Sequence, residues 1–239
     1  MKLTVITSVL NSSFFLDHFI EDIKRQTIFE DCEFFFLDAD SQDNSREKIL
    51  KEVNNFKNIQ YFNVGKKNIY ETWNLGVILS KTKYLSNWNT DDCRFPSSLE
   101  EQVNFLEENE ELDLCYGPTY WTETPNQFAE LCSTLEVIPC MGSSHEEMMQ
   151  MNSPHCLPVW RRRLHENYGL FNETFFSAGD YEMWMRVLSR GSKFGKIDEM
   201  IGTYYRNPKG ISSNPDTFDS SVAEVFRIRE FYGNDSNKF

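Results

Sequence analysis

The chain has 239 residues, of which 40% are hydrophobic and 15% aromatic, so it can bury a substantial core and is not a disordered protein. Its formal net charge of -13 opposes nonspecific binding to nucleic acid or anionic lipid, and an anionic substrate would need a local basic group or a metal ion. Its six cysteines show no CxxC spacing, which supports neither a zinc site nor a disulfide framework.

The first half of the chain alternates strand and helix patterns with short links. Strands are expected over 3–9, 33–38, 59–64 and 84–88. Helices are expected from 15 to about 26, after 45 to about 53, over 69–79, and from 98 to about 108. This alternation predicts βαβ units and a mostly parallel, nucleotide-binding type of sheet flanked by helices. Neither GxGxxG nor GxxxxGK[ST] occurs, so phosphate binding would have to use a metal ion.

The second half is less regular. The pattern indicates a fifth strand at 114–117, irregular strands and loops over 118–151, and a short helix over 159–167. A largely buried helix is expected from 179 to 188, strands at 193–197 and 201–205, and a closing helix at 218–232.

The opening residues look like a strand and are too few for a signal peptide. No apolar run approaches membrane-spanning length, so no transmembrane segment is expected. We therefore expect a soluble, cytoplasmic protein.

Two adjacent acids, Asp91 and Asp92, follow the strand at 84–88. Open α/β sheets place their ligand crevice at the carboxyl ends of the strands. Neighbouring unpaired carboxylates repel each other, and a divalent ion shared with a diphosphate removes that conflict. Oxygen ligands of this kind suit Mg²⁺ or Mn²⁺. Taken alone, the pair is equally typical of a solvated turn.

Several motifs in one order make the chain resemble the family 2 glycosyltransferases of the GT-A fold over nearly its whole length. They are the opening strand with Asn11 and Gln26-Thr27, then Asp38-Ala39-Asp40-Ser41-Gln42-Asp43, Asn74-Leu75-Gly76, the DxDD-type Asn89-Thr90-Asp91-Asp92, and Gly179 to Arg186. The resemblance implies a single GT-A domain over 1–239. Its nucleotide-sugar-binding half would be 1–117, and its smaller acceptor-binding and catalytic-base half would be 118–239.

The chain departs from the family pattern at several positions. Ser8 stands where the family commonly has Pro, and Ala39, Asn89 and Gly179 stand where it often has acids. Asn207-Pro208 occupies the place of a His that can complete the metal sphere. These differences leave Asp91 as the direct metal ligand and Asp92 as a ligand or its neighbour. The metal is expected to be weakly held until the sugar nucleotide brings its own oxygens.

The resemblance implies an inverting, metal-dependent transfer of a sugar from a nucleoside-diphosphate sugar to a hydroxyl of a glycan or other acceptor. Asp91 and Asp92 would hold Mn²⁺ or Mg²⁺, and Asp180 would accept the proton of the acceptor hydroxyl. Ser177 followed by Asp180 is also a variant of the capping box, which would explain this acid without catalysis.

Further contacts follow from the same resemblance, although each residue also has an ordinary structural explanation. Nucleotide contacts are expected from Thr7, Asn11, Asp38, Asp40, Asn74 and Arg206. Sugar or acceptor contacts are expected from Tyr70, His155 and Trp184, the last of which is more typical of a core residue.

Two alternatives remain at this point. A sugar-phosphate nucleotidyltransferase would need a Gly-rich, basic loop after the first strand, and residues 8–13 contain neither Gly nor a basic residue. A sugar-nucleotide-binding module without turnover is compatible with the substitutions at Ala39, Asn89 and Gly179.

Overall fold

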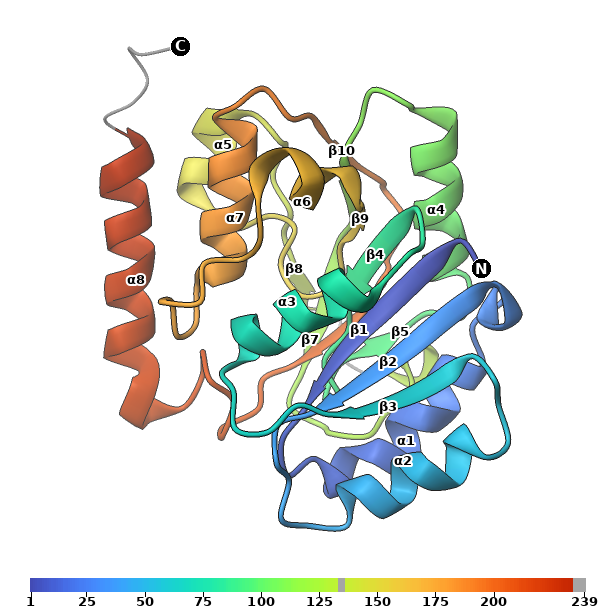
Figure 1. Ribbon diagram of the computed structural model, residues 1–239. Coiled ribbons are helices and arrows are strands. Elements are labelled where there is room, and N and C mark those ends of the chain that lie inside the picture. The colour runs from blue at the N-terminus through green and yellow to red at the C-terminus, as the bar shows by residue number, and fades with distance from the viewer. Residues whose placement is uncertain (133–135, 234–239) are drawn as a thin grey trace.

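The computed structural model describes residues 1–132 and 136–233 and contains two sheets (Figure 1). The strands are β1 (Leu3–Val9), β2 (Cys32–Asp38), β3 (Ile59–Asn63), β4 (Tyr84–Asn87), β5 (Cys93–Arg94), β6 (Leu114–Tyr116), β7 (Thr119–Thr122), β8 (Val137–Ile138), β9 (Val159–Arg161), β10 (Phe194–Lys196) and β11 (Gly202–Tyr205). The helices are α1 (Ser13–Lys24), α2 (Ser45–Val53), α3 (Ile69–Leu79), α4 (Ser98–Glu108), α5 (His145–Gln150), α6 (Arg163–Tyr168), α7 (Gly179–Leu188) and α8 (Pro215–Gly233). Short 3-10 turns lie at Phe29–Asp31 and Ala129–Leu131.

The large sheet has the strand order β10-β6-β9-β4-β1-β2-β3. The four strands from β4 to β3 are parallel, and β9 runs antiparallel between β4 and β6. The expected mostly parallel sheet flanked by helices is therefore confirmed.

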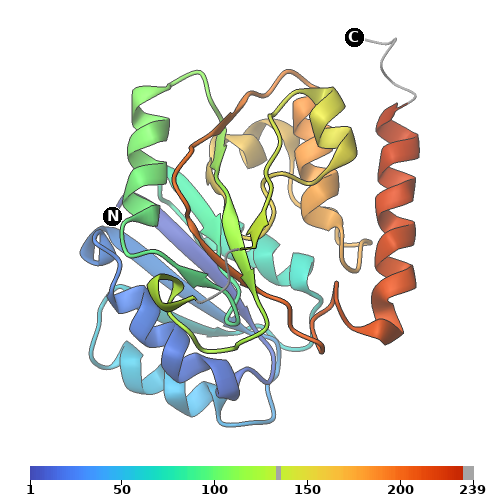
Figure 2. The same ribbon diagram turned by 180° about the vertical axis from the view of Figure 1, so that it is seen from behind.

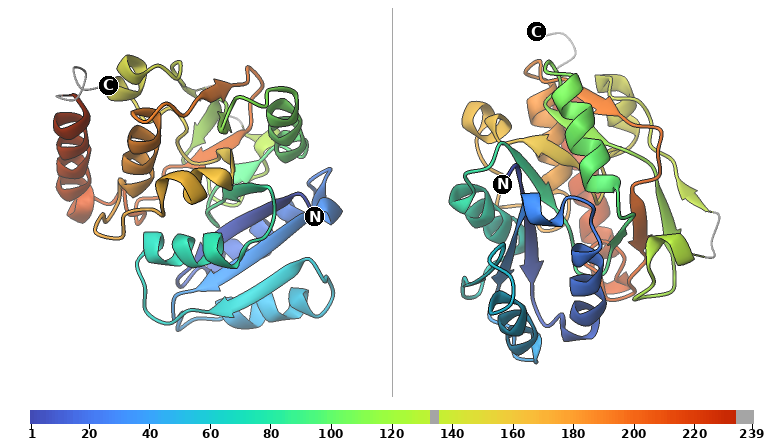
Figure 3. Two further views of the ribbon diagram at one scale, coloured as in Figure 1. Left: turned by 45° about the horizontal axis from the view of Figure 1, so that its top comes forward. Right: turned by 90° about the vertical axis from the view of Figure 1, so that its right-hand side faces the viewer.

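Helices cover both faces of this sheet because successive side chains of a strand point to opposite faces. Val5 of β1 belongs to the same core cluster as Phe19 of α1, whereas its neighbour Ile6 packs with Trp73 of α3. Figure 3 shows α3 on one side of the sheet and α1 and α2 on the other. A Cβ at Gly76 would come within 2.6 Å of the Ile6 side chain, so the glycine lets α3 approach β1 closely.

The prediction of a helix over 159–167 is wrong for its first residues, 159–161. Val159 to Arg161 form β9, and a helix begins only at Arg163. All three β9 side chains are buried. Arg161 tolerates burial because its guanidinium donates to the Leu112 carbonyl at 2.7 Å and to the Tyr84 hydroxyl at 3.0 Å.

The region 118–151, expected as irregular strands and loops, contains the short strands β7 and β8 and a helix, α5, that the pattern did not indicate. Ser144 and Glu147 form a capping box at the start of α5, which is the sequence signal that was missed. Residues 133–135 of this region lie outside the described residues.

The small sheet has the order β5-β11-β7-β8 and is seen from behind in Figure 2. In it β11 pairs antiparallel with β5, so that Thr203 lies opposite Cys93. This pairing brings the segment after β11 to the turn that carries Asp91 and Asp92. In the part of the chain that the structure describes, no helix has both the length and the apolar character to cross a membrane.

Candidate active site

A cavity of about 970 Å³ opens at the carboxyl ends of the parallel strands. Ser8 near the end of β1, Ala39 after β2 and Asn89 after β4 line its inner part. The N-terminal part of α3, the first turn of α7, the segment after β11 and one face of α8 complete the wall. Its volume suits a nucleotide-sized ligand, and its place at the strand ends is where open α/β sheets bind ligands.

Four residues that the sequence predicted for the site line this cavity: Asp91, Asp180, Tyr70 and His155. Asp91 comes from the turn after β4 and Asp180 from the first turn of α7, so carboxylates from both halves of the chain face one space. Asp92, Thr7, Asn11, Asp38, Asp40, Asn74, Trp184 and Arg206 do not line it.

Asp91 and Asp92 have different surroundings although they are adjacent. One Asp91 carboxylate oxygen accepts a hydrogen bond from Asn207 Nδ2 at 2.9 Å, and burial raises the pKa of this acid. Asp92 is 1% exposed and accepts from the Tyr205 N–H at 3.2 Å and from Asn89 Nδ2 at 3.4 Å. Asp91 is thus the acid open to the cavity, and Asp92 fastens the turn to β11.

The residues around Asp91 fit a divalent ion that takes few ligands from the protein. In the described ranges, no group of three or more His, Cys, Asp and Glu side chains is arranged to hold a metal. Mg²⁺ and Mn²⁺ sites often use one or two carboxylates and take their other oxygens from substrate phosphates and water. Asn207 lies where the family resemblance suggested a His, and its amide contacts Asp91 directly. Asp91 therefore fits as the protein ligand of an ion that the diphosphate completes.

Asp180 is held by hydrogen bonds from two other elements. Asn152 Nδ2 donates to one carboxylate oxygen at 2.9 Å, and the Tyr70 hydroxyl approaches the other at 3.3 Å. The Tyr70 hydroxyl has a single proton, which it shares between the Ser177 carbonyl, 2.6 Å away, and this more distant carboxylate oxygen. A Cβ at Gly179 would come within 2.8 Å of the Tyr70 ring, so the ring fills the space beside this glycine.

The structure contradicts the capping box proposed for Ser177 and Asp180. The N-cap residue of α7 is Ala178, and its side chain makes no capping hydrogen bond. Instead, Glu224 of α8 accepts the N–H groups of Phe176, Ser177 and Ala178 at 2.7 to 2.9 Å. A capping acid would have a lowered pKa, whereas burial raises the pKa of Asp180. The raised pKa makes the Asp180 carboxylate a stronger base.

His155 lies on the cavity wall in a conformation that few residues other than glycine adopt, with φ of 46°. Its ring meets the Tyr204 ring edge-on, with 4.7 Å between centroids. Burial lowers the pKa of His155 to about 4, so the imidazole is neutral near pH 7. Its buried Nδ1 has no hydrogen-bond partner within the described residues.

Asn74 and Trp184 have structural surroundings rather than a place on the cavity. The Asn74 amide bonds both the N–H and the carbonyl of Phe171 at 2.9 Å. Trp184 is 1% exposed and packs edge-on against Trp160 and Phe171. Thr7 is buried within β1.

Asn11, Asp38 and Asp40 brace two loops beside the cavity. Asn11 accepts the Gln42 N–H through its side-chain oxygen at 2.8 Å. Asp38 accepts the Ser41 N–H at 2.8 Å and the Tyr61 hydroxyl at 2.7 Å. Asp40 has φ of 72° in the same loop. The polar residues that line the cavity here are Ser8 and Ser12, neither of which was predicted to contact a ligand.

The basic groups on the cavity differ from the one predicted. Arg206 lies over the Trp121 ring and lines a neighbouring hollow. Lys67, Lys209 and Arg229 line the main cavity instead. An acidic chain thus gathers positive charge where an anionic ligand would bind. No periodicity or motif in the sequence marked these three residues.

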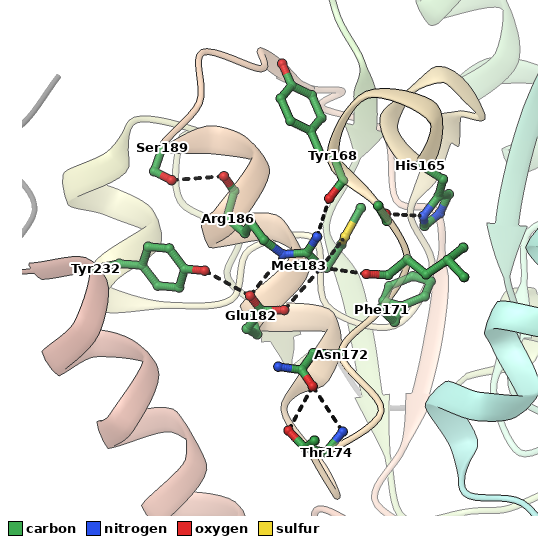
Figure 4. A network of polar contacts seen from close by, with 12 residues as sticks. His165, Tyr168, Phe171, Asn172, Thr174, Glu182, Met183, Arg186, Ser189 and Tyr232 are labelled. Carbon is green, nitrogen blue, oxygen red and sulfur yellow. Dashed lines mark hydrogen bonds and ion pairs between the residues drawn. The ribbon is translucent and has the colours of Figure 1, made fainter.

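Glu182 and Arg186 of α7 belong to a network of polar contacts that reaches Tyr232 of α8 (Figure 4). Arg186 Nε contacts Glu182 at 3.0 Å, which makes an ion pair between residues four apart on this helix. Arg186 also donates to the carbonyls of Tyr168 and Leu170. The Tyr232 hydroxyl of α8 donates to Glu182 at 2.9 Å. This network fixes α8 against α7 and so holds the outer wall of the cavity in place.

A mostly parallel sheet with a cavity at its strand ends is the layout of an α/β ligand-binding domain, and the comparisons with known proteins identify it as a glycosyltransferase domain of the GT-A type. Residues 4–156 match the family model described as glycosyl transferase family 2, and the chain belongs to that family.

Two relatives carry names of the same kind. An uncharacterized glycosyltransferase of Rickettsia bellii is 25% identical over 94% of this chain and 32% of its own length. An uncharacterized glycosyltransferase of Methanocaldococcus jannaschii, MJ1057, is 23% identical over 80% of this chain and 65% of its own length. The chain therefore spans a third to two thirds of these relatives.

Solved structures share the fold. Residues 1–349 of TarS from S. aureus in complex with UDP-GlcNAc superpose with a TM-score of 0.75 at 16% identity, over 97% of this chain and 66% of that one. The mannosyltransferase PcManGT from Pyrobaculum calidifontis, in complex with GDP-Man and Mn²⁺, gives 0.70 at 12% identity, over 95% of this chain and 63% of that one.

Proposed function

We propose that this domain transfers a sugar, with inversion, from a nucleoside-diphosphate sugar to an acceptor hydroxyl, with help from a divalent metal ion. The observation that carries the proposal is that Asp91 and Asp180, from opposite halves of the sequence, line one cavity at the strand ends. Inversion follows because a single carboxylate base acts on the acceptor while the diphosphate leaves, with no covalent intermediate on the protein.

The donor would lie with its diphosphate near Asp91. Asp91 would hold Mn²⁺ or Mg²⁺, which when bound stabilises the leaving diphosphate as a Lewis acid. Lys67 and Lys209 line the same cavity and supply positive charge to the same anion. His155, neutral and with an unpaired Nδ1, is placed to accept a hydrogen bond from a sugar hydroxyl.

Asp180 is the proposed base. Its carboxylate accepts the proton of the acceptor hydroxyl as the oxygen attacks the anomeric carbon. The hydrogen bonds from Asn152 and Tyr70 fix the direction of the carboxylate before substrate arrives. Complexes of structural neighbours with UDP-GlcNAc, and with GDP-Man and Mn²⁺, support a donor of this class.

A thermal-shift screen of UDP, GDP and their sugar conjugates, with and without Mn²⁺, tests donor binding directly, because a ligand that binds the folded chain stabilises it by mass action. Each nucleotide sugar that stabilises the chain is then assayed for release of free nucleoside diphosphate. Stabilisation that depends on Mn²⁺, followed by release, is the expected result. A chain that no nucleotide stabilises would contradict the proposal.

The second candidate is a sugar-nucleotide-binding module without turnover. It is favoured by the two hydrogen bonds that occupy Asp92, and by the absence from the described residues of a three-group metal cluster. Strong nucleotide binding without release from any sugar conjugate would select this candidate.

A further inference from the structure

The outer wall of the cavity is largely apolar. Phe176, Phe218 and Phe226 are between 44% and 64% exposed, and all three line the cavity. On α8, Phe218, Val222 and Val225 follow one another at spacings of four and three residues, so they lie on one face of the helix. Exposed apolar side chains that gather in this way mark a contact surface for a ligand or partner.

The polar groups of this wall are few. The Ser221 hydroxyl lies within hydrogen-bond distance of the Thr217 and Ile211 carbonyls, so it is already engaged. Arg229 donates to the Gln150 carbonyl, and its Nε is buried without a partner among the described residues. A bare glycan has hydroxyls on every side that need hydrogen-bond partners when they leave water. The side chains of this wall are mainly apolar and so match an alkyl chain.

The wall is continuous with the place where the acceptor must react. Phe176 lies four residues before Asp180, and Tyr181, which follows Asp180, lines the same cavity. The buried carboxylate of Asp180, whose pKa is raised, can take the proton that a hydroxyl nucleophile must lose. An anionic phosphate nucleophile would need no such base. The reacting group is therefore a hydroxyl, and the rest of the acceptor extends toward α8.

We propose that the acceptor is amphiphilic, with a hydroxyl that reacts beside Asp180 and an apolar chain that lies against Phe218, Val222, Val225 and Phe226. This inference rests on the proposed function. In the reaction the acceptor oxygen bonds to the anomeric carbon, the bond from that carbon to the diphosphate oxygen breaks, and the hydroxyl proton passes to Asp180.

Methyl β-D-glucoside and octyl β-D-glucoside form a matched pair of probes, because they differ only in chain length. Their binding to the full chain is measured by calorimetry in the presence of UDP and, in a parallel series, of GDP, below the concentration at which the octyl compound forms micelles. The octyl glucoside is expected to bind at least about tenfold more tightly, since its chain leaves water.

Two residues of α8 provide a matched control. Phe226 and Phe231 are both 64% exposed, and only Phe226 lines the cavity. Phe226→Ala is expected to lower the preference for octyl over methyl glucoside at least about fivefold, because it removes apolar surface from the wall. Phe231→Ala should leave that preference unchanged. Both side chains are exposed, so neither change should prevent folding.

Equal affinity for the two glucosides, or equal effects of the two substitutions, would overturn the proposal. A third contrary outcome is a dimer in analytical ultracentrifugation that Phe226→Ala dissociates, found together with equal binding of the two glucosides. In that case a second copy of the chain covers the wall. Tighter binding of octyl than of methyl glucoside supports an acceptor with an apolar chain. Co-sedimentation with phosphatidylcholine vesicles then shows whether that acceptor is a membrane lipid. Co-sedimentation that requires Phe226 assigns the acceptor to a membrane lipid, and its absence assigns it to a free amphiphile.

The failure of this inference can be told from failure of the proposed function. If UDP or GDP stabilises the chain and the octyl preference is absent, only the apolar acceptor is contradicted. If neither nucleotide is bound, the donor cavity itself is contradicted.

Discussion

Asp91 and Asp180 face the same cavity, and the protein supports them in different ways. Asp91 has a hydrogen bond from Asn207, which lies in the segment after β11. Asp180 has hydrogen bonds from Asn152 and Tyr70, and its helix start is fastened to α8 by Glu224. The carboxylate of Asp180 is therefore more firmly fixed by the protein than that of Asp91, as the proposed roles of a preformed base and of a metal ligand completed by the diphosphate require.

The largest expected effect comes from Asp180. Asp180→Asn keeps the shape and one of the two accepting oxygens but removes the base, so transfer should fall by roughly 10³-fold. Nucleotide binding, measured by thermal shift, should stay unchanged because the donor end is intact. Turnover within a few-fold of the parent would remove Asp180 from the mechanism.

Asp91→Asn should affect the part of the site where the metal ion and the diphosphate are proposed to bind. We expect the Mn²⁺-dependent part of the nucleotide thermal shift to disappear and transfer to fall by roughly 10²-fold, because the leaving diphosphate loses stabilisation. Asp92→Asn is the neighbouring control, and its effect should fall mainly on stability, since Asp92 accepts the Tyr205 N–H. A Mn²⁺ response that survives in Asp91→Asn and is lost in Asp92→Asn would reverse the assignment.

Glu224→Gln tests whether α8 positions the base. Glutamine has one acceptor oxygen for the three N–H groups before α7, so unfolding should require about 1–3 kcal/mol less free energy. Urea unfolding measures this loss. Turnover should fall by about tenfold, if the loosened turn misplaces Asp180.

Asp219→Asn is the control for this change, because Asp219 is an exposed acid on the same helix. It should alter neither stability nor turnover. An equal loss of stability in both variants would mean that α8 does not act through Glu224.

The smallest effect is a shift in the pH profile. The hydrogen bonds from Asn152 and Tyr70 lower the pKa of Asp180 and so oppose the larger effect of burial, which raises it. Asn152→Ala should therefore raise this pKa further and move the acid limb of the rate profile to higher pH. Tyr70→Phe should move it in the same direction by less, because Tyr70 is the weaker contributor. A limb that moves to lower pH in either variant would contradict this account of Asp180.

Sequence reasoning predicted the elements of the first half of the chain well because its patterns are local. The helix expected over 69–79 begins and ends where α3 does, since Asn68 and Glu71 form a capping box there. β9 could not be predicted in the same way. A three-residue strand that contains Arg161 is buried only because distant carbonyls accept its guanidinium.

The candidate site shows the same limit. The resemblance to the family implied that Asp91 and Asp180 serve one site, and both residues line the cavity. The Asn74 motif was equally visible, yet its amide turns to the Phe171 backbone. Lys209 and the α8 wall reach the cavity through the approach of segments that are far apart in sequence, and no local pattern records that approach.

A crystal structure of the chain with Mn²⁺ and a non-hydrolysable analogue of the nucleotide sugar that stabilises it would test the central claim most directly. The account predicts the diphosphate and metal at Asp91, with the anomeric carbon facing the Asp180 carboxylate across the space left for the acceptor. A donor bound with its sugar directed away from Asp180, or with its diphosphate remote from Asp91, would contradict it.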